Sequence, residues 1–168
     1  MGKTEAKAKG PYWTPKRIAR MAIFIALSAV GSFIKIPSPT GTVALDSLPG
    51  YFSAVAWGYL EGAIVISLGH ILTAATVGFP LSIPLHILIA VMMMIWAVIF
   101  RWTSEKIHWT VGIVAATFFN GVVATAAFIP IFGEGFFYAM LIPLVVASFV
   151  NVAIAGVANQ IVKKAGYI

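Results

Sequence analysis

The chain has 168 residues, of which 61% are hydrophobic and 10% are charged, and its mean hydropathy is +0.99. This composition is typical of a membrane protein with several spans and excludes an ordinary soluble domain, and the runs lack the strict alternation of a transmembrane β-barrel. The formal net charge is +6, but the basic residues gather at the ends of apolar runs, which the positive-inside rule explains better than nucleic-acid binding. Cysteine is absent, so disulfides, a thiolate nucleophile and a cysteine metal site are excluded.

Residues 1–15 form a basic tail, whose Lys3, Lys7 and Lys9 suit an anionic cytoplasmic leaflet. The apolar segment after Arg20 has no small-residue cleavage site close behind it, so we expect a retained first span rather than a signal peptide. Residues 16–168 are then predicted to form one transmembrane domain.

Apolar length and the distribution of charge together predict six spanning helices, which gives an all-α fold. In chain order the predicted spans are residues 16–36, 45–57, 62–77, 85–102, 109–129 and 137–162. A turn around Glu61 separates the second from the third, and the polar stretch 101–109 separates the fourth from the fifth. Loops rich in Pro and Gly are predicted at 37–44, 78–84 and 130–136.

Charge sets the predicted orientation. With the N-terminus in the cytoplasm, ten of the eleven Lys and Arg residues fall on the cytoplasmic side, and only Lys35 falls outside. Both termini are therefore predicted to be cytoplasmic in a multi-pass protein. The three loops rich in Pro and Gly then face outward and are candidates for a shaped entrance.

Small residues recur on one face of the first span. Ala19, Ala22, Ala26 and Ala29 are three or four positions apart, which aligns them on a helix. Such a face lets a second membrane helix approach closely. The alternative, that these alanines only fill a helix, stays open.

Polar residues within apolar runs are the candidate binding residues, because a polar group in hydrocarbon is kept where it finds a partner. Asp46 precedes the second span, with Tyr51 one turn further in, although Asp46 also suits a helix N-cap. His70 and His86 have no third ligand at helical spacing, which favours hydrogen bonding to an organic ligand over a metal site.

Asn120 and Asn151 are deep polar residues of the fifth and sixth spans, and helix-to-helix hydrogen bonding is their alternative role. Glu134 and Tyr138 lie in or beside the aromatic-rich third outer loop, whose composition suits closure over a flat aromatic ligand. Glu134 is equally compatible with simple solvation.

Several chemistries lack their motifs. The sequence has no Walker loop, no HExxH, no nucleophile elbow and no paired carboxylates. We therefore expect a non-catalytic protein that has no resident cofactor, does not bind nucleic acid and does not hydrolyse ATP itself.

The residues also resemble a known family. The basic start KRIARMAIFIAL, the run TGTVALDSLPGYFSAVAWG, the Gly58–Gly62 turn and the segment GAIVISLGH are similar to the substrate-binding S components of energy-coupling factor (ECF) vitamin importers. This resemblance extends from Arg17 to Lys164 in span count, topology and loop pattern.

The resemblance implies a six-helix protein of the bacterial plasma membrane that captures a vitamin or precursor from outside. It implies a transmembrane coupling subunit, docked on Ala22 and Ala26, and two cytoplasmic ATPase subunits. By position it also implies that the substrate is bound by residues at the outer ends of spans or in gating loops, namely Asp46, Tyr51, His70, His86, Asn120, Glu134, Tyr138 and Asn151.

Within that family, KIPSPTGTVALDSLPGYF and GHILTAATVGFPLSIPLH most resemble the branch linked to α-ribazole, the dimethylbenzimidazole riboside of cobalamin's lower ligand. Riboflavin, thiamine or a queuosine precursor suits the same residues. Two other functions stay open, a stand-alone carrier of small molecules or ions and a structural membrane subunit.

Overall fold

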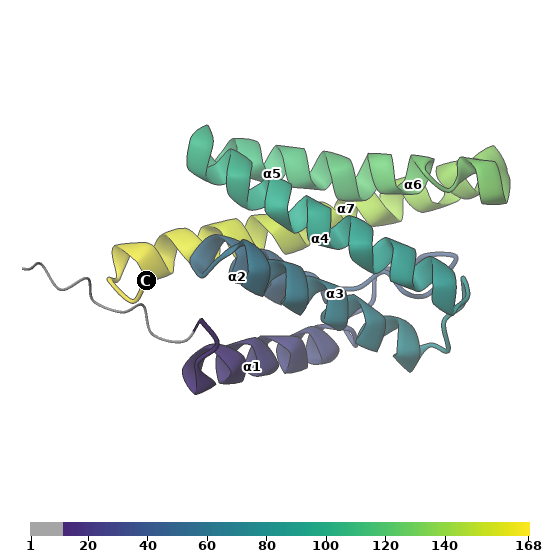
Figure 1. The fold of residues 1–168 in the computed structure, drawn as a ribbon. Helices are drawn as coiled ribbons and strands as arrows, with labels where there is room; N and C mark the ends of the chain where they lie inside the picture. Colours follow the sequence, from purple (N-terminus) through teal and green to yellow (C-terminus); the bar gives the residue numbers. More distant parts are fainter. Residues whose placement is uncertain (1–11) are drawn as a thin grey trace, which may run out of the picture.

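The computed structural model describes residues 12–168, which form helices joined by short connections (Figure 1). Among the described residues, the β-pairing consists of one isolated antiparallel bridge between Lys35 and Ala44. The all-α prediction is therefore confirmed for the described residues. The predicted tail lysines Lys3, Lys7 and Lys9 lie outside them.

Apart from the 16-residue connection 32–47 between the first two, the helices follow one another along the chain with six intervening residues or fewer. They are α1 (Pro15–Gly31), α2 (Leu48–Ala56), α3 (Tyr59–Thr76), α4 (Ile83–Lys106), α5 (Trp109–Phe118), the π-helical turn η1 (Phe119–Val123), α6 (Ala124–Ala126) and α7 (Ile129–Lys164). Four segments are long and apolar enough to cross a membrane: α3, α4, the run from α5 through α6, and α7. The predicted membrane character is confirmed in this form.

Helix α2 is the innermost element, because it packs against α1, α3, α4 and α7. Its Tyr51 and Ala54 are fully buried, and Tyr51 meets Phe100 of α4 edge to face at 5.6 Å. Nine residues of helix rise only about 13 Å, less than half the roughly 30 Å of a bilayer core. The predicted helix over 45–57 begins three residues too early, because α2 begins at Leu48. Pro49 explains this, since its ring is tolerated in a first turn but clashes with a preceding turn of helix.

The predicted loop over 130–136 is also wrong, because these residues form the first turns of α7. Pro130 occupies the first turn, where a missing amide hydrogen costs nothing. Gly133 alone leaves the helical conformation, with φ 78° and ψ 174°, and kinks the segment there. Proline therefore starts a short helical segment, and Gly133 separates this segment from the long helix that follows it.

Other predicted boundaries shift by a few residues. Helix α1 ends at Gly31, five residues before the predicted end of the first span. Helix α3 begins at Tyr59, so Glu61 lies in its first turn rather than in a turn between spans. Helix α4 continues to Lys106, which reduces the predicted polar connection to Ile107 and His108.

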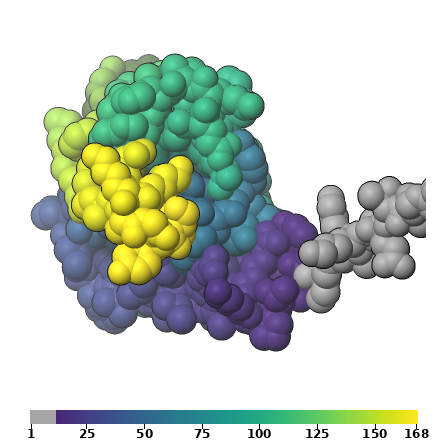
Figure 2. Space-filling model, turned by 90° about the vertical axis from the view of Figure 1, so that its left-hand side faces the viewer, coloured from purple at the N-terminus to yellow at the C-terminus, as the bar shows by residue number. Residues whose placement is uncertain are grey.

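The basic residues collect at one end of the bundle, where α1 begins and where α4 and α7 end (Figure 1). Figure 2 looks at this end and shows the C-terminal segment in yellow on the same face as the start of α1 in purple. Arg17 forms a 2.7 Å ion pair with Glu61, and Arg101 forms a 2.6 Å ion pair with Glu105. Lys35 lies beyond the opposite end of α1.

Candidate functional site

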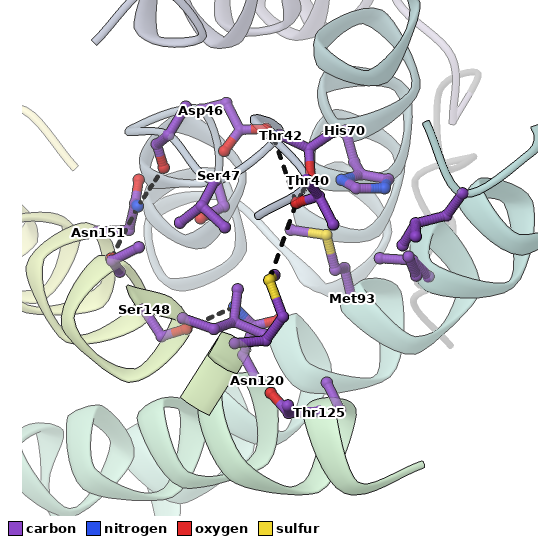
Figure 3. Close-up of a pocket in the computed structure, with 18 of the residues that line it drawn as sticks. Thr40, Thr42, Asp46, Ser47, His70, Met93, Asn120, Thr125, Ser148 and Asn151 are labelled. Atoms are coloured by element: carbon purple, nitrogen blue, oxygen red, sulfur yellow. Dashed lines mark hydrogen bonds between the residues drawn. The ribbon is translucent and has the colours of Figure 1, made fainter. Parts of the chain in front are cut away.

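A cavity lies at the end of the bundle away from the basic residues, between a loop and the helices α3, α4, η1 and α7 (Figure 3). Most of its surface is apolar. The polar residues that line it are Thr40, Thr42, Asp46, Ser47, His70, Asn120, Thr125, Ser148 and Asn151. The larger apolar ones are Leu81, Ile89, Met93, Phe128, Phe136, Met140 and Leu144.

The loop between α1 and α2 folds as a small hairpin. Its arms are joined by hydrogen bonds from Ile36 N–H to Val43 O at 3.0 Å and from Leu45 N–H to Ile34 O at 3.1 Å. Gly41 turns the chain at φ 65°, a conformation that glycine adopts without strain. Thr40 and Thr42 flank that turn, and their hydroxyls are 2.8 Å apart at the cavity wall.

The hairpin ends in Asp46 and Ser47, both buried and both lining the cavity. Ser47 rather than Asp46 is the residue that precedes the first turn of α2, so the N-cap alternative for Asp46 does not hold. Burial raises the pKa of this loop carboxyl from its usual 3.8 to about 6. Asp46 is therefore a desolvated acceptor facing a mostly apolar space.

Asn120 owes its position to the π-helical turn η1. One residue is added to a helical turn there, and Thr125 Oγ1 donates to Gly121 O at 2.6 Å. Gly121 lies against Val145 of α7, where a side chain would not fit. Asn120 Nδ2 then donates to Ser148 Oγ at 2.7 Å. Interruptions of this kind often occur at functional sites.

His70 lines the cavity from α3, and its Nε2 lies 3.2 Å from Nδ1 of His86 on α4. His86 is fully buried behind His70, and Phe79 packs edge to face on its ring at 5.7 Å. The second histidine thus orients the first and does not reach the cavity. No cluster of three His, Asp or Glu side chains able to hold a metal occurs within residues 12–168.

Asn151 lies at the back of the cavity, 1% exposed, with its amide directed at the hairpin (Figure 3). Its Nδ2 donates to Ala44 O at 3.0 Å and to Ala147 O at 2.9 Å. Its Oδ1 accepts from Leu48 N–H at 2.8 Å. Both donors of the amide are thus used within the protein, which suits a positioning residue better than a direct ligand contact.

The structure brings four of the eight candidate substrate-binding residues together in the cavity lining, namely Asp46, His70, Asn120 and Asn151. His86 stands behind the lining, and Tyr51 is directed into the core between α2 and α4. Glu134 and Tyr138 are exposed, Tyr138 to 67%, and lie outside the lining.

Sequence reasoning missed part of the lining. The missed polar residues are Thr40, Thr42 and Ser47. The polar composition of the first outer loop could have indicated them. Met140, Leu144 and Ala147 gave no signal, because an apolar side chain facing a cavity looks the same in sequence as one facing lipid.

The cavity has one carboxylate, one histidine at its wall and no lysine or arginine among the residues that line it. A phosphate or carboxylate group would find no countercharge there and would meet Asp46. The arrangement instead suits an uncharged molecule that donates hydrogen bonds on one side and presents a flat apolar face on the other.

One of three comparisons with known proteins finds a match. The family model described as "ECF transporter, substrate-specific component" matches residues 16–161, most of the chain. No curated protein and no solved structure matches.

Proposed function

We propose that this chain, which belongs to the family of substrate-specific components of ECF transporters, captures α-ribazole in the cavity beneath the hairpin. Components of this family bind small molecules, are not catalysts and work with a membrane coupling subunit and ATPases. The finer assignment concerns the substrate and the residues that hold it.

The observation that carries the proposal is that one cavity joins a polar wall at the hairpin to aromatic side chains, with Asn120, Thr125 and Ser148 adding polar groups on the side of η1 and α7. Asp46, Ser47 and Thr42 gather on the side of the hairpin and α2. Phe128, Phe136 and Met140 supply aromatic and polarizable contacts from α7 and the segment before it, and the two rings lie 6.5 Å apart at an angle of 67°. A base bearing a ribose has the same two halves.

In the proposed complex the ribose hydroxyls donate to the Asp46 carboxylate, and the base lies against the Phe128 and Phe136 rings. Hydrogen bonds to a charged acceptor are about twice as strong as neutral ones, which makes this carboxylate the main determinant for the sugar. Asn120 has its Nδ2 bonded to Ser148, which leaves its Oδ1 for a donor on the substrate. His70 presents its ring from α3.

We further propose that both termini lie on the cytoplasmic side of a bacterial plasma membrane and that six segments run between the two ends of the bundle, of which α2 is too short to cross the hydrocarbon core by itself. Support comes from the single end at which α1 begins and α7 finishes, and from the basic residues gathered there. In this orientation the cavity faces outward. Glu134 and Tyr138 are then candidates only for contacts made when the start of α7 moves over the cavity.

The test is native mass spectrometry of the protein purified in mild detergent, first as isolated and then after incubation with α-ribazole, riboflavin, thiamine and a queuosine precursor. We expect an adduct of the α-ribazole mass, lost in His70→Ala and kept in Thr103→Ala, a buried residue of α4 that does not line the cavity. A different adduct would replace the substrate and keep the binding function. No adduct from any compound would contradict a capture role for this cavity.

A further inference from the structure

A second recess lies at the basic end of the bundle, between the start of α1, the junction of α2 with α3, and the last two residues of the chain. Its surface, unlike that of the substrate cavity, is more polar than apolar. Three cationic side chains line it, Lys16, Arg17 and Arg20. One side-chain carboxylate, Glu61, lies among them, and Ile168 brings the backbone carboxylate at the end of the given sequence.

The charges in the recess do not cancel. Glu61 Oε1 is 2.7 Å from Arg17 Nε, so this carboxylate is used by one of the three cations. The Arg20 guanidinium lies over the Trp57 ring at 4.7 Å, a contact that leaves its charge available. Within residues 12–168, Lys16 and Arg20 have no carboxylate partner within ion-pair distance.

Aromatic residues place this recess at the level of lipid headgroups. Trp13 is 47% exposed just before α1, and Trp57 lines the recess from the end of α2. Tryptophan is enriched at the boundary between hydrocarbon and headgroups. From this level Ile23, Leu27 and Val30 follow one exposed side of α1 at helical spacing and offer an apolar track for an acyl chain.

We propose that the recess binds the phosphate of an anionic phospholipid headgroup through Lys16 and Arg20, with the acyl chains lying along α1. Basic recesses between membrane helices commonly hold such headgroups. A free phosphate ion satisfies the same cations but makes no use of the apolar track. An acidic protein surface likewise makes no contact with the apolar side chains of that track.

The experiment is native mass spectrometry of the full chain in mild detergent, titrated with phosphatidylglycerol or with phosphatidylcholine. The test variant is the double substitution Lys16→Gln with Arg20→Gln. The matched control is Lys163→Gln with Lys164→Gln, which removes the same charge from the end of α7 without touching the recess. Because each cation near a membrane surface contributes about 1 kcal/mol, we expect phosphatidylglycerol to bind the test variant, which lacks two of them, about thirtyfold more weakly.

The control should bind phosphatidylglycerol within about twofold of the unchanged chain, and phosphatidylcholine should bind both weakly. Equal binding of the two lipids, or equal losses in the two variants, would overturn the proposal. Displacement of the lipid by excess inorganic phosphate would make this a free-phosphate site, and displacement by polyglutamate would make it a protein-docking site. Should the double variant melt early, Lys16→Gln alone, an exposed residue, gives the same comparison.

Discussion

Asn151 Nδ2 donates a 3.0 Å hydrogen bond to the carbonyl of Ala44, which lies 107 residues earlier in the chain. The same amide accepts from Leu48 N–H at 2.8 Å. One side chain of α7 therefore fixes both the end of the hairpin and the first residue of α2. These segments carry Asp46 and Ser47 between them, so the position of the polar wall depends on Asn151.

We predict that Asn151→Ala weakens both the fold and substrate capture. The substitution removes three hydrogen bonds and leaves Ala44 O and Leu48 N–H without this partner, at a cost of roughly 1 kcal/mol or more for each buried group. The hairpin would then lose its register against α7. Thermal melting in detergent, with and without the bound substrate, measures both effects.

Asn159→Ala is the matched control, because Asn159 is also a buried asparagine of α7 but does not line the cavity. Its Oδ1 has no hydrogen-bond partner among the described residues, so less is lost on truncation. We expect a smaller fall in melting temperature and unchanged capture. Unchanged capture in Asn151→Ala would refute the positioning role.

The Asp46 carboxyl should make the free protein pH-sensitive. Burial in the loop raises its pKa to about 6 from 3.8, so the folded state holds this proton more tightly than the unfolded state does. The folded protein then loses stability as pH rises from about 4 to about 6 and loses no more from this group above that. Melting of the substrate-free protein across that range measures the slope.

Asp46→Asn should remove this slope, because an amide does not titrate. Glu134→Gln removes an exposed carboxyl outside the cavity and should leave the slope unchanged. A slope that persists in Asp46→Asn would assign the titration to another group.

Much of the helical layout is predictable from the sequence because hydropathy and charge act over whole segments. The predicted span over residues 85–102, which lies within α4, and the break after Thr76 both follow from apolar length and from Gly78 and Pro80. The start of α2 and the start of α7 do not. Whether proline begins a helix or ends one depends on the neighbouring segments. Here these are the hairpin before α2 and the kink at Gly133 within α7.

For the cavity, single polar residues in apolar runs were informative, since His70 and Asn120 both reach it. The sequence did not distinguish residues that face the cavity from those that support it. His86 and Asn151 form hydrogen bonds with other residues of the protein. Those partners are not adjacent in the sequence, so the supporting role cannot be read from it. The π-helical turn at Asn120 has no sequence signature of its own and arises from packing against α7.

Close packing between α2 and α3 depends on Gly62. A side chain at this position would collide with the backbone of Ala54, which cannot move without displacing the whole of α2. We predict that Gly62→Ala lowers stability by about 1–3 kcal/mol, the usual cost of overpacking. Gly135→Ala is the control, since nothing lies within 4 Å of the added carbon there. Equal melting temperatures for the two variants would show that the α2–α3 contact is looser than the structure has it.

Ala22 and Ala26 are predicted to form the surface of α1 that docks on the coupling subunit. Both are exposed on the outer side of α1, where no described helix covers them. A tryptophan at either position is therefore accommodated by the isolated chain but not by a partner helix packed closely against it. We expect Ala22→Trp and Ala26→Trp to reduce co-purification with the coupling subunit by roughly tenfold or more while substrate capture is kept.

Val114→Trp tests whether position matters, because Val114 is 69% exposed on α5, across the bundle from α1 (Figure 1). In the proposed assembly the tryptophan at position 114 contacts only lipid. Co-purification with the coupling subunit and uptake of the substrate should therefore match those of the unchanged chain. If the α5 variant loses the coupling subunit as fully as the α1 variants do, the small-residue face of α1 is not the docking surface. If the α1 variants keep it, the alanines only fill a helix, the alternative that the spacing alone left open.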